Sequence, residues 1–91
     1  MTIRVLLVDD HAVVREGYRR LIEKHIGIDV VGEADTAASG YQAFKTLQPD
    51  IVVIDISMPG RGGIDLVRQI HQLDSSARVL IFSMHASTTY A

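Results

Sequence analysis

The sequence predicts an α/β protein built on a doubly wound parallel sheet. Short apolar runs alternate along the chain with longer segments in which apolar residues recur at helical spacing. The runs Ile3–Val8 and Asp50–Ile56 are rich in β-branched residues and nearly unbroken by polar ones, which is typical of strands buried on both faces. Strands and helices in this order form a parallel sheet through right-handed crossovers, with helices on both faces.

The first helix is predicted over residues 11–26, directly after the first strand. Gly17 lies inside this segment and costs about 1 kcal/mol relative to alanine. Gly27 is the expected C-terminal stop. The predicted inward face of the helix consists of Val14, Tyr18, Leu21, Ile22 and Ile26.

The second strand, Ile28–Glu33, has a more polar pattern and is predicted to lie at an edge of the sheet. Asp35 or Thr36 can cap the helix that follows. Pro49 is expected to end that helix. Its predicted inward residues are Tyr41, Phe44 and Leu47.

The third strand is the run Asp50–Ile56, and the segment "MPGRGG" after it is predicted to be a loop. A third helix is expected over Ile64–Leu73, and a fourth strand over Ala77–Ser83. The predicted inward positions of the third helix are Ile64, Val67, Ile70 and Leu73. Met58 and Met84 are interpreted as packing residues.

The composition narrows the class of protein. Ninety-one residues correspond to one domain, and a hydrophobic content of 47% indicates a globular chain. A net charge of −2 disfavours nucleic-acid binding by this segment, and the lack of cysteine excludes disulfides. No apolar run approaches the roughly 20 residues that span a bilayer. We therefore expect a cytoplasmic protein with no membrane segment.

Acidic side chains follow two of the buried strands. Asp9 and Asp10 come directly after the first strand, Asp55 lies near the end of the third, and Ser83 ends the fourth. Ligands of such sheets bind outside the carboxyl ends of the strands. If the first and third strands are neighbours, these side chains converge on one rim, where we expect the paired acids to lie in water.

Three clustered carboxylates without a nearby Lys or Arg favour a hard divalent cation such as Mg²⁺. A carboxylate can also attack phosphorus and form an aspartyl phosphate, a reaction that depends on charge neutralisation and positioning. His11 follows the acid pair and is interpreted as a solvated residue at a helix start, with contact to the site as the alternative. A Ser83–His85 hydrolase is disfavoured because the sequence has no nucleophile elbow.

The segments "LLVDDH", "VVIDISMPGRGGIDL" and "VLIFSMHA" resemble the receiver (REC) domain of bacterial two-component response regulators, most closely the NarL/FixJ subfamily with LuxR-type output. The resemblance covers essentially the whole chain and implies a flavodoxin-like (CheY-like) fold, with strand order 2-1-3-4 for the strands present. It implies that Asp55 is the phosphoacceptor and that Asp10 binds Mg²⁺ directly, with Asp9 acting partly through water. The backbone carbonyl of Ser57 would complete the metal ligands, and Ser83 would contact the phosphoryl group as the switch hydroxyl.

The chain departs from the family at its C-terminal end. A complete receiver has a fifth strand that ends in an essential Lys, whereas this sequence stops at Ala91, where a fourth helix should begin. We therefore interpret residues 1–91 as a single, C-terminally truncated receiver domain, impaired in switching and without its DNA-binding output domain. The expected partners are a sensor histidine kinase and a second copy of the chain, which would associate through the exposed edge of the fourth strand.

The predicted phosphoacceptor switch is not an enzyme, apart from catalysing its own phosphorylation and dephosphorylation. Two other functions compete with this prediction. A haloacid-dehalogenase-type phosphatase would need a second Asp where Ser57 stands. A non-phosphorylated interaction module that retains the receiver fold remains the alternative. Arg15, Arg19 and Arg20 are interpreted as a solvated helix face, with a kinase-docking surface as the second interpretation.

Overall fold

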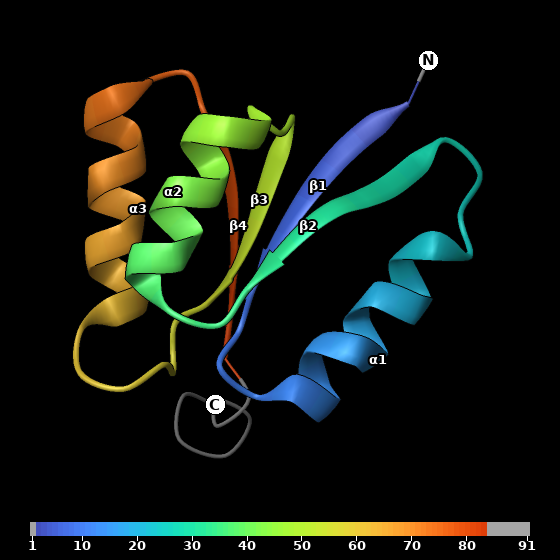
Figure 1. Cartoon of the computed structure of the whole chain (residues 1–91), viewed down its shortest axis with the longest axis horizontal. Coiled ribbons are helices and arrows are strands. Elements are labelled where there is room, and N and C mark those ends of the chain that lie inside the picture. Colours follow the sequence, from blue (N-terminus) through green and yellow to red (C-terminus); the bar gives the residue numbers. More distant parts are fainter. Residues whose placement is uncertain (1, 84–91) are drawn as a thin grey trace, which may run out of the picture.

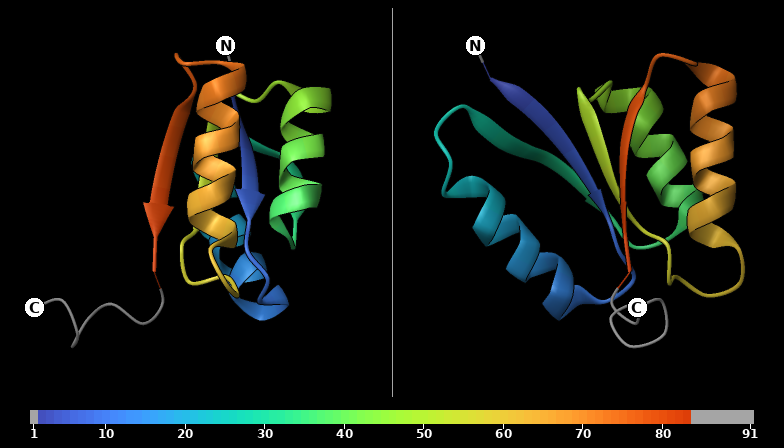
Figure 2. Two further views of the ribbon diagram at one scale, coloured as in Figure 1. Left: turned by 90° about the vertical axis from the view of Figure 1, so that its left-hand side faces the viewer. Right: turned by 180° about the vertical axis from the view of Figure 1, so that it is seen from behind.

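The computed structural model describes residues 2–83, and its strands and helices alternate along the chain (Figure 1). The elements are β1 (Ile3–Val8), α1 (Ala12–Glu23), β2 (Ile28–Ala34), α2 (Ala37–Leu47), β3 (Ile51–Asp55), α3 (Gly62–Leu73) and β4 (Arg78–Phe82). All strands pair in parallel in the order β2-β1-β3-β4, so the predicted fold class and strand order are confirmed. Helix α1 covers one face of the sheet, and α2 and α3 cover the other (Figure 2).

The larger core lies between the sheet and the helices α2 and α3. Thr36 caps α2, because its hydroxyl accepts the Ser39 N–H at 3.0 Å and Ser39 caps Thr36 in return. Gln48, at φ 48°, ends the helix directly before Pro49. The buried residues of this core are Leu6, Val8, Ala34, Phe44, Val52, Ile54, Met58, Leu66 and Ile70.

Helix α1 packs less deeply, on the opposite face, where Tyr18 and Ile22 contact Val5, Leu7 and Val53 of the sheet. The helix ends at Glu23 rather than at residue 26. The predicted apolar face of α1 is therefore partly wrong: the turn after the helix carries Ile26, which is fully exposed, and Leu21 is 58% exposed.

The predicted face of α3 also needs correction. The helix begins at Gly62, and its buried residues are Gly63, Leu66 and Ile70. Ile64 and Leu73, which the apolar spacing placed inward, are instead exposed. The reason is the close approach of Gly63 to β3, where an added Cβ would lie 2.8 Å from the carbonyl oxygen of Asp55.

Of the two methionines interpreted as packing residues, the structure describes Met58. Met58 is buried, as predicted, whereas Met84 and His85 lie outside the described residues. Between residues 2 and 83, no helix combines the length and apolar character needed to cross a membrane.

Candidate metal centre

The acidic residues do converge at one edge of the sheet. Strands β1 and β3 are neighbours with Val8 opposite Ile54, so Asp9 and Asp55 leave the sheet side by side. The Asp9 N–H donates to the carbonyl of Ala34 at 3.0 Å, which ties the chain after β1 to the end of β2. Ligand atoms of four residues lie within 4.8 Å of one another: Asp9, Asp10, His11 and Asp55. The predicted convergence of the three aspartates is therefore confirmed.

The expectation that the paired acids lie in water is wrong for Asp9 and holds only in part for Asp10. Asp9 and Asp55 are both 0% exposed, and the side chain of Asp10 is 25% exposed. The chain turns into α1 directly after the acid pair, and the His11 ring lies over the carboxylates, 3.1 Å from Asp10 and 3.5 Å from Asp9. Two carboxylates in a dry environment need a positive partner, because burial of an unpaired charge is costly.

Each buried aspartate has one oxygen fixed by hydrogen bonds. Asp55 Oδ1 accepts the backbone N–H of Ser57 at 2.8 Å and its hydroxyl at 2.6 Å. Asp9 Oδ1 accepts the backbone N–H of His11 at 2.9 Å. The two bonds from backbone N–H groups span two residues along the chain, a local pattern that Asp readily adopts at the end of a strand. The position of each Asp at the end of its strand therefore indicates these backbone bonds. It does not indicate that the Ser57 hydroxyl also donates to Asp55.

One oxygen of each of the three aspartates is buried without a hydrogen bond in the described part of the chain. These oxygens are Asp9 Oδ2, Asp10 Oδ1 and Asp55 Oδ2. Burial, above all, raises the pKa of the Asp9 carboxyl; the His11 N–H opposes the rise, and the charge of Asp55 adds to it. A divalent cation would satisfy the three oxygens and cancel their repulsion. Oxygen ligands from carboxylates suit Mg²⁺, so the residues present fit the predicted cation.

The basic residues of α1 differ in their surroundings. Arg15 is half-buried and donates to the carbonyl of Asp9 at 2.6 Å and to Glu33 Oε1 at 2.9 Å. Arg19 also reaches Glu33, at 3.3 Å, whereas Arg20 pairs with Glu16 on its own helix. The interpretation as a solvated helix face is therefore wrong for Arg15, which braces the turn that carries the acid pair against β2.

Ser83 and Ser57 occupy the positions that the order of the strands implies. Phe82 is the register partner of Asp55, and Ser83 follows it at the carboxyl end of β4. The Ile56 N–H donates to the carbonyl of Phe82 at 2.8 Å, which keeps the two strand ends together. Ser57 lies in the turn directly after β3, where its hydroxyl contacts Asp55.

Comparison with known proteins assigns this arrangement to a family. The family model for the response regulator receiver domain matches residues 5–91. The chain belongs to the response regulator receiver family. Among curated relatives of this family, the response regulator UvrY of Escherichia coli is 41% identical over 83 residues, which cover 91% of this chain and 38% of UvrY.

Other members agree with the NarL/FixJ resemblance. The nitrate/nitrite response regulator NarL of Escherichia coli is 35% identical over 80 residues, or 88% of this chain and 37% of NarL. A crystal structure of a LuxR-family two-component response regulator from Aurantimonas sp. SI85-9A1 superposes with a TM-score of 0.89 at 53% identity. That alignment covers 96% of this chain and 62% of the other. The receiver chain thus spans less than two fifths of the length of both curated relatives.

Proposed function

We propose that this receiver accepts a phosphoryl group on Asp55 from a sensor histidine kinase, in a reaction that uses Mg²⁺. In the full-length protein, this switch would control a DNA-binding output domain and thereby transcription. One observation carries the proposal. Asp55 is a fully buried carboxylate with Oδ1 fixed by Ser57 and with Oδ2 left without a hydrogen bond.

Asp55 Oδ2 is the proposed nucleophile. It attacks the phosphorus of the donor phosphohistidine, the P–N bond breaks, and the nitrogen retains the bonding electron pair. The two hydrogen bonds from Ser57 hold the carboxylate in one orientation during this step. Ser83, at the end of the neighbouring strand, would donate a hydrogen bond from its hydroxyl to the new phosphoryl group.

The proposed protein ligands of Mg²⁺ are Asp9, Asp10, Asp55 and the backbone carbonyl of Ser57, at the edge of the sheet where the three carboxylates meet. When bound, the cation supplies positive charge that stabilises the phosphoryl oxygens. The raised pKa of Asp9 supports this assignment, because its carboxylate is poorly stabilised without a cation. Phosphorylation would then add negative charge beside β4 and act as the switch.

Intact-mass spectrometry with phosphoramidate, a small donor with a P–N bond, tests this function. We expect a mass gain of one phosphoryl group that requires Mg²⁺ and disappears in Asp55→Asn. Asp35→Asn is the matched control, because Asp35 also follows a strand but is exposed and outside the acid cluster. Phosphorylation of Asp55→Asn at the wild-type level, or none in the wild type, would contradict the proposal.

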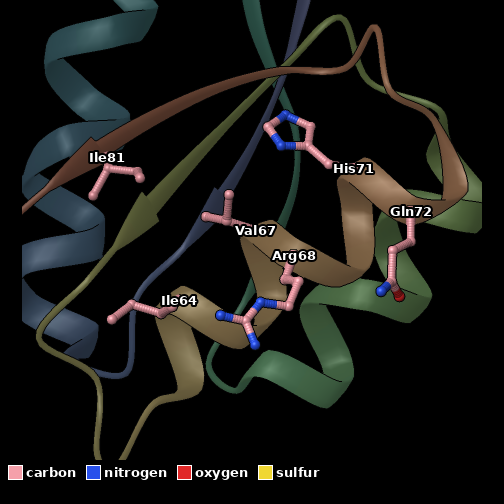
Figure 3. A pocket seen from close by; sticks show the side chains of 6 residues that line it. All are labelled: Ile64, Val67, Arg68, His71, Gln72 and Ile81. Carbon is pink, nitrogen blue, oxygen red and sulfur yellow. The ribbon is translucent and has the colours of Figure 1, made fainter.

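We also propose that this 91-residue chain associates with a second copy along β4. In the described part of the chain, β4 lies at the edge of the sheet and pairs only with β3. Leu80 is 60% exposed and Ile81 45% exposed, so both faces of this edge carry uncovered apolar side chains. A groove of about 430 Å³ continues the apolar surface between β4 and α3 (Figure 3). Its lining residues are Ile64, Val67, Arg68, His71, Gln72 and Ile81.

Size-exclusion chromatography with light scattering tests this association. We expect a concentration-dependent dimer or larger species that Leu80→Lys weakens, because a charge on an edge strand opposes edge-to-edge pairing. Ile26→Lys is the matched control, since Ile26 is a fully exposed apolar residue in a turn away from β4. A clean monomer at high concentration would refute the proposal.

A further inference from the structure

His11 lies among the carboxylates of the metal centre rather than beside it. Its Nδ1 is 3.1 Å from Asp10 Oδ1, 3.5 Å from Asp9 Oδ1 and 4.0 Å from Asp55 Oδ2. These contacts involve all three acids of the proposed Mg²⁺ site. A residue in this position can add a nitrogen ligand to a set that otherwise consists of oxygens.

The approach of His11 to Asp10 does not form a hydrogen bond. Asp10 Oδ1 remains without a hydrogen-bond partner although Nδ1 is only 3.1 Å away. The two atoms are close enough to be neighbouring ligands of one cation, and they form an ion pair when the imidazole is protonated. Adjacent ligands of one cation at metal–ligand distances of about 2.1 Å lie roughly 3.0 Å apart, and opposite ligands roughly 4.2 Å apart. Nδ1 lies 3.1 Å from Asp10 Oδ1 and 4.0 Å from Asp55 Oδ2, two oxygens that are available to the cation, and both separations are close to these values.

The backbone holds the imidazole in this place. His11 is the N-cap residue of α1, with φ −97° and ψ 106°, and its side chain makes no capping hydrogen bond. Its backbone N–H is bound to Asp9 Oδ1, so the histidine and the first acid are fixed to each other. The His11 side chain is 51% exposed, whereas the Asp9 side chain beside it is fully buried, so His11 lies between the acid cluster and the solvent.

We propose that His11 Nδ1 is a ligand of the cation held by Asp9, Asp10 and Asp55, and that it sets which cation the site prefers. The inference rests on the proposed metal site and specifies its selectivity. Mg²⁺ prefers oxygen ligands, whereas Ni²⁺ and Zn²⁺ accept imidazole nitrogen readily. His11 therefore favours Ni²⁺ and Zn²⁺ over Mg²⁺ relative to a site made of the carboxylates alone.

Isothermal titration of the 91-residue chain with MgCl₂ and with NiCl₂ tests the inference. In His11→Ala we expect Ni²⁺ affinity to fall about tenfold or more, the scale of loss typical when a metal-site contact is removed, while Mg²⁺ affinity changes by less than about twofold. His25→Ala is the matched control, since His25 is exposed and outside the cluster. It removes one surface imidazole and should leave both affinities unchanged.

A second measurement does not depend on affinity. In ¹⁵N NMR spectra of the histidine rings, the diamagnetic ion Zn²⁺ should shift the Nδ1 resonance of His11 far more than its Nε2 resonance. The His25 resonances should be unaffected at stoichiometric Zn²⁺. Shifts at Nε2 alone, or at neither nitrogen, would overturn the assignment of Nδ1 as a ligand.

The outcomes separate this inference from the proposed function. The inference is wrong if His11→Ala leaves the Ni²⁺ affinity unchanged, or if it lowers or raises the Ni²⁺ and Mg²⁺ affinities equally. Higher affinity for both cations would mean that His11 acts as a positive charge that competes with them. If the wild type binds no Mg²⁺ and Asp10→Asn changes neither titration, the proposed metal site itself fails. Retained Mg²⁺ binding with unchanged Ni²⁺ binding would remove only the role of His11.

Discussion

Ser57 donates two hydrogen bonds to a single carboxylate oxygen of Asp55, from its backbone N–H at 2.8 Å and from its hydroxyl at 2.6 Å. The other oxygen of Asp55 is buried and has no hydrogen-bond partner among residues 2–83. This arrangement distinguishes the two oxygens of one side chain. One is fixed by the turn after β3, and the other is left for a cation or a phosphoryl group.

Ser57→Ala removes the hydroxyl and keeps the backbone bond. A typical hydrogen bond contributes about 0.5–1.5 kcal/mol, so the rate of Asp55 phosphorylation should fall by a factor of about two to ten. The rate of phosphoryl incorporation from phosphoramidate, followed by intact mass, measures this. Ser39→Ala is the control, because it also removes a hydroxyl that takes part in a local hydrogen bond, the one that Ser39 Oγ accepts from the Thr36 N–H at the start of α2. Equal rates in Ser57→Ala and the wild type would show that the hydroxyl does not orient the nucleophile.

Asp9→Asn should stabilise the protein when no metal is present. The substitution removes a buried charge that lies beside two other carboxylates, so we expect a gain of about 1–3 kcal/mol in the free energy of unfolding at neutral pH. The pKa of Asp9 in the folded state lies above its ordinary value of 3.8. The folded state thus binds more protons than the unfolded state between these two values, and the wild type loses stability as the pH rises through this window.

Urea denaturation in EDTA at several pH values checks this prediction. The stability difference between Asp9→Asn and the wild type should be small near pH 3 and grow as the pH rises through the raised pKa of Asp9. Excess Mg²⁺ should reverse the order, since a ligand at 100 times its Kd stabilises the folded state by about 2.7 kcal/mol. A variant that is less stable than the wild type in EDTA at neutral pH would show that Asp9 is already well paired.

The sheet rim and its acids could be predicted from the sequence, because the alternation of strands and helices places all strand ends on one edge. Strands β1 and β3 also consist of nearly unbroken apolar runs, whereas β2 does not, so their greater burial could be predicted. The surroundings of the acids could not be predicted in the same way. The start of α1 could be predicted to within one residue, but Asp9 is buried by contacts with the end of β2 and with the His11 side chain, which the pattern of apolar residues does not reveal.

The inward face of α3 could not be predicted for a related reason. Counting apolar residues favours large side chains such as Ile64, yet the helix is positioned by Gly63, whose contribution is the absence of a side chain. Similarly, Arg15, Arg19 and Arg20 belong to the same predicted helix, and the sequence does not indicate which of them contacts the sheet. Only the packing of α1 against β2 brings Arg15 to Glu33 and to the carbonyl of Asp9.

Gly63→Ala tests the close contact between α3 and β3. The added Cβ would lie 2.8 Å from the backbone oxygen of Asp55 and from Ile56 Cα, so the helix or the strand end must shift. We expect a loss of about 1–3 kcal/mol in the free energy of unfolding. Gly17→Ala in α1 is the matched control, since no atom lies within 4 Å of its added Cβ. That variant should gain about 0.5–1 kcal/mol, because alanine favours a helix interior.

Arg15→Ala should weaken Mg²⁺ binding although Arg15 contacts no carboxylate of the site. The side chain holds the backbone at Asp9 through a 2.6 Å hydrogen bond, and removal of such outer contacts costs about 10–100-fold in metal affinity. Arg20→Ala removes an equal charge from the same helix at an exposed position. Calorimetric titration with Mg²⁺ compares the two variants. If Arg15→Ala and Arg20→Ala bind Mg²⁺ with equal affinity, Arg15 acts only through its charge.

The most direct test of the account is NMR of the 91-residue chain with Mg²⁺ and beryllofluoride, a phosphoryl analogue that binds carboxylates. We predict that the two added together shift the resonances of Asp10, Asp55 and Ser83, and that neither Asp55→Asn nor a sample with EDTA shows these shifts. Unchanged resonances at saturating Mg²⁺ and beryllofluoride would contradict the phosphoacceptor site. They would favour an interaction module that retains the receiver fold without phosphorylation.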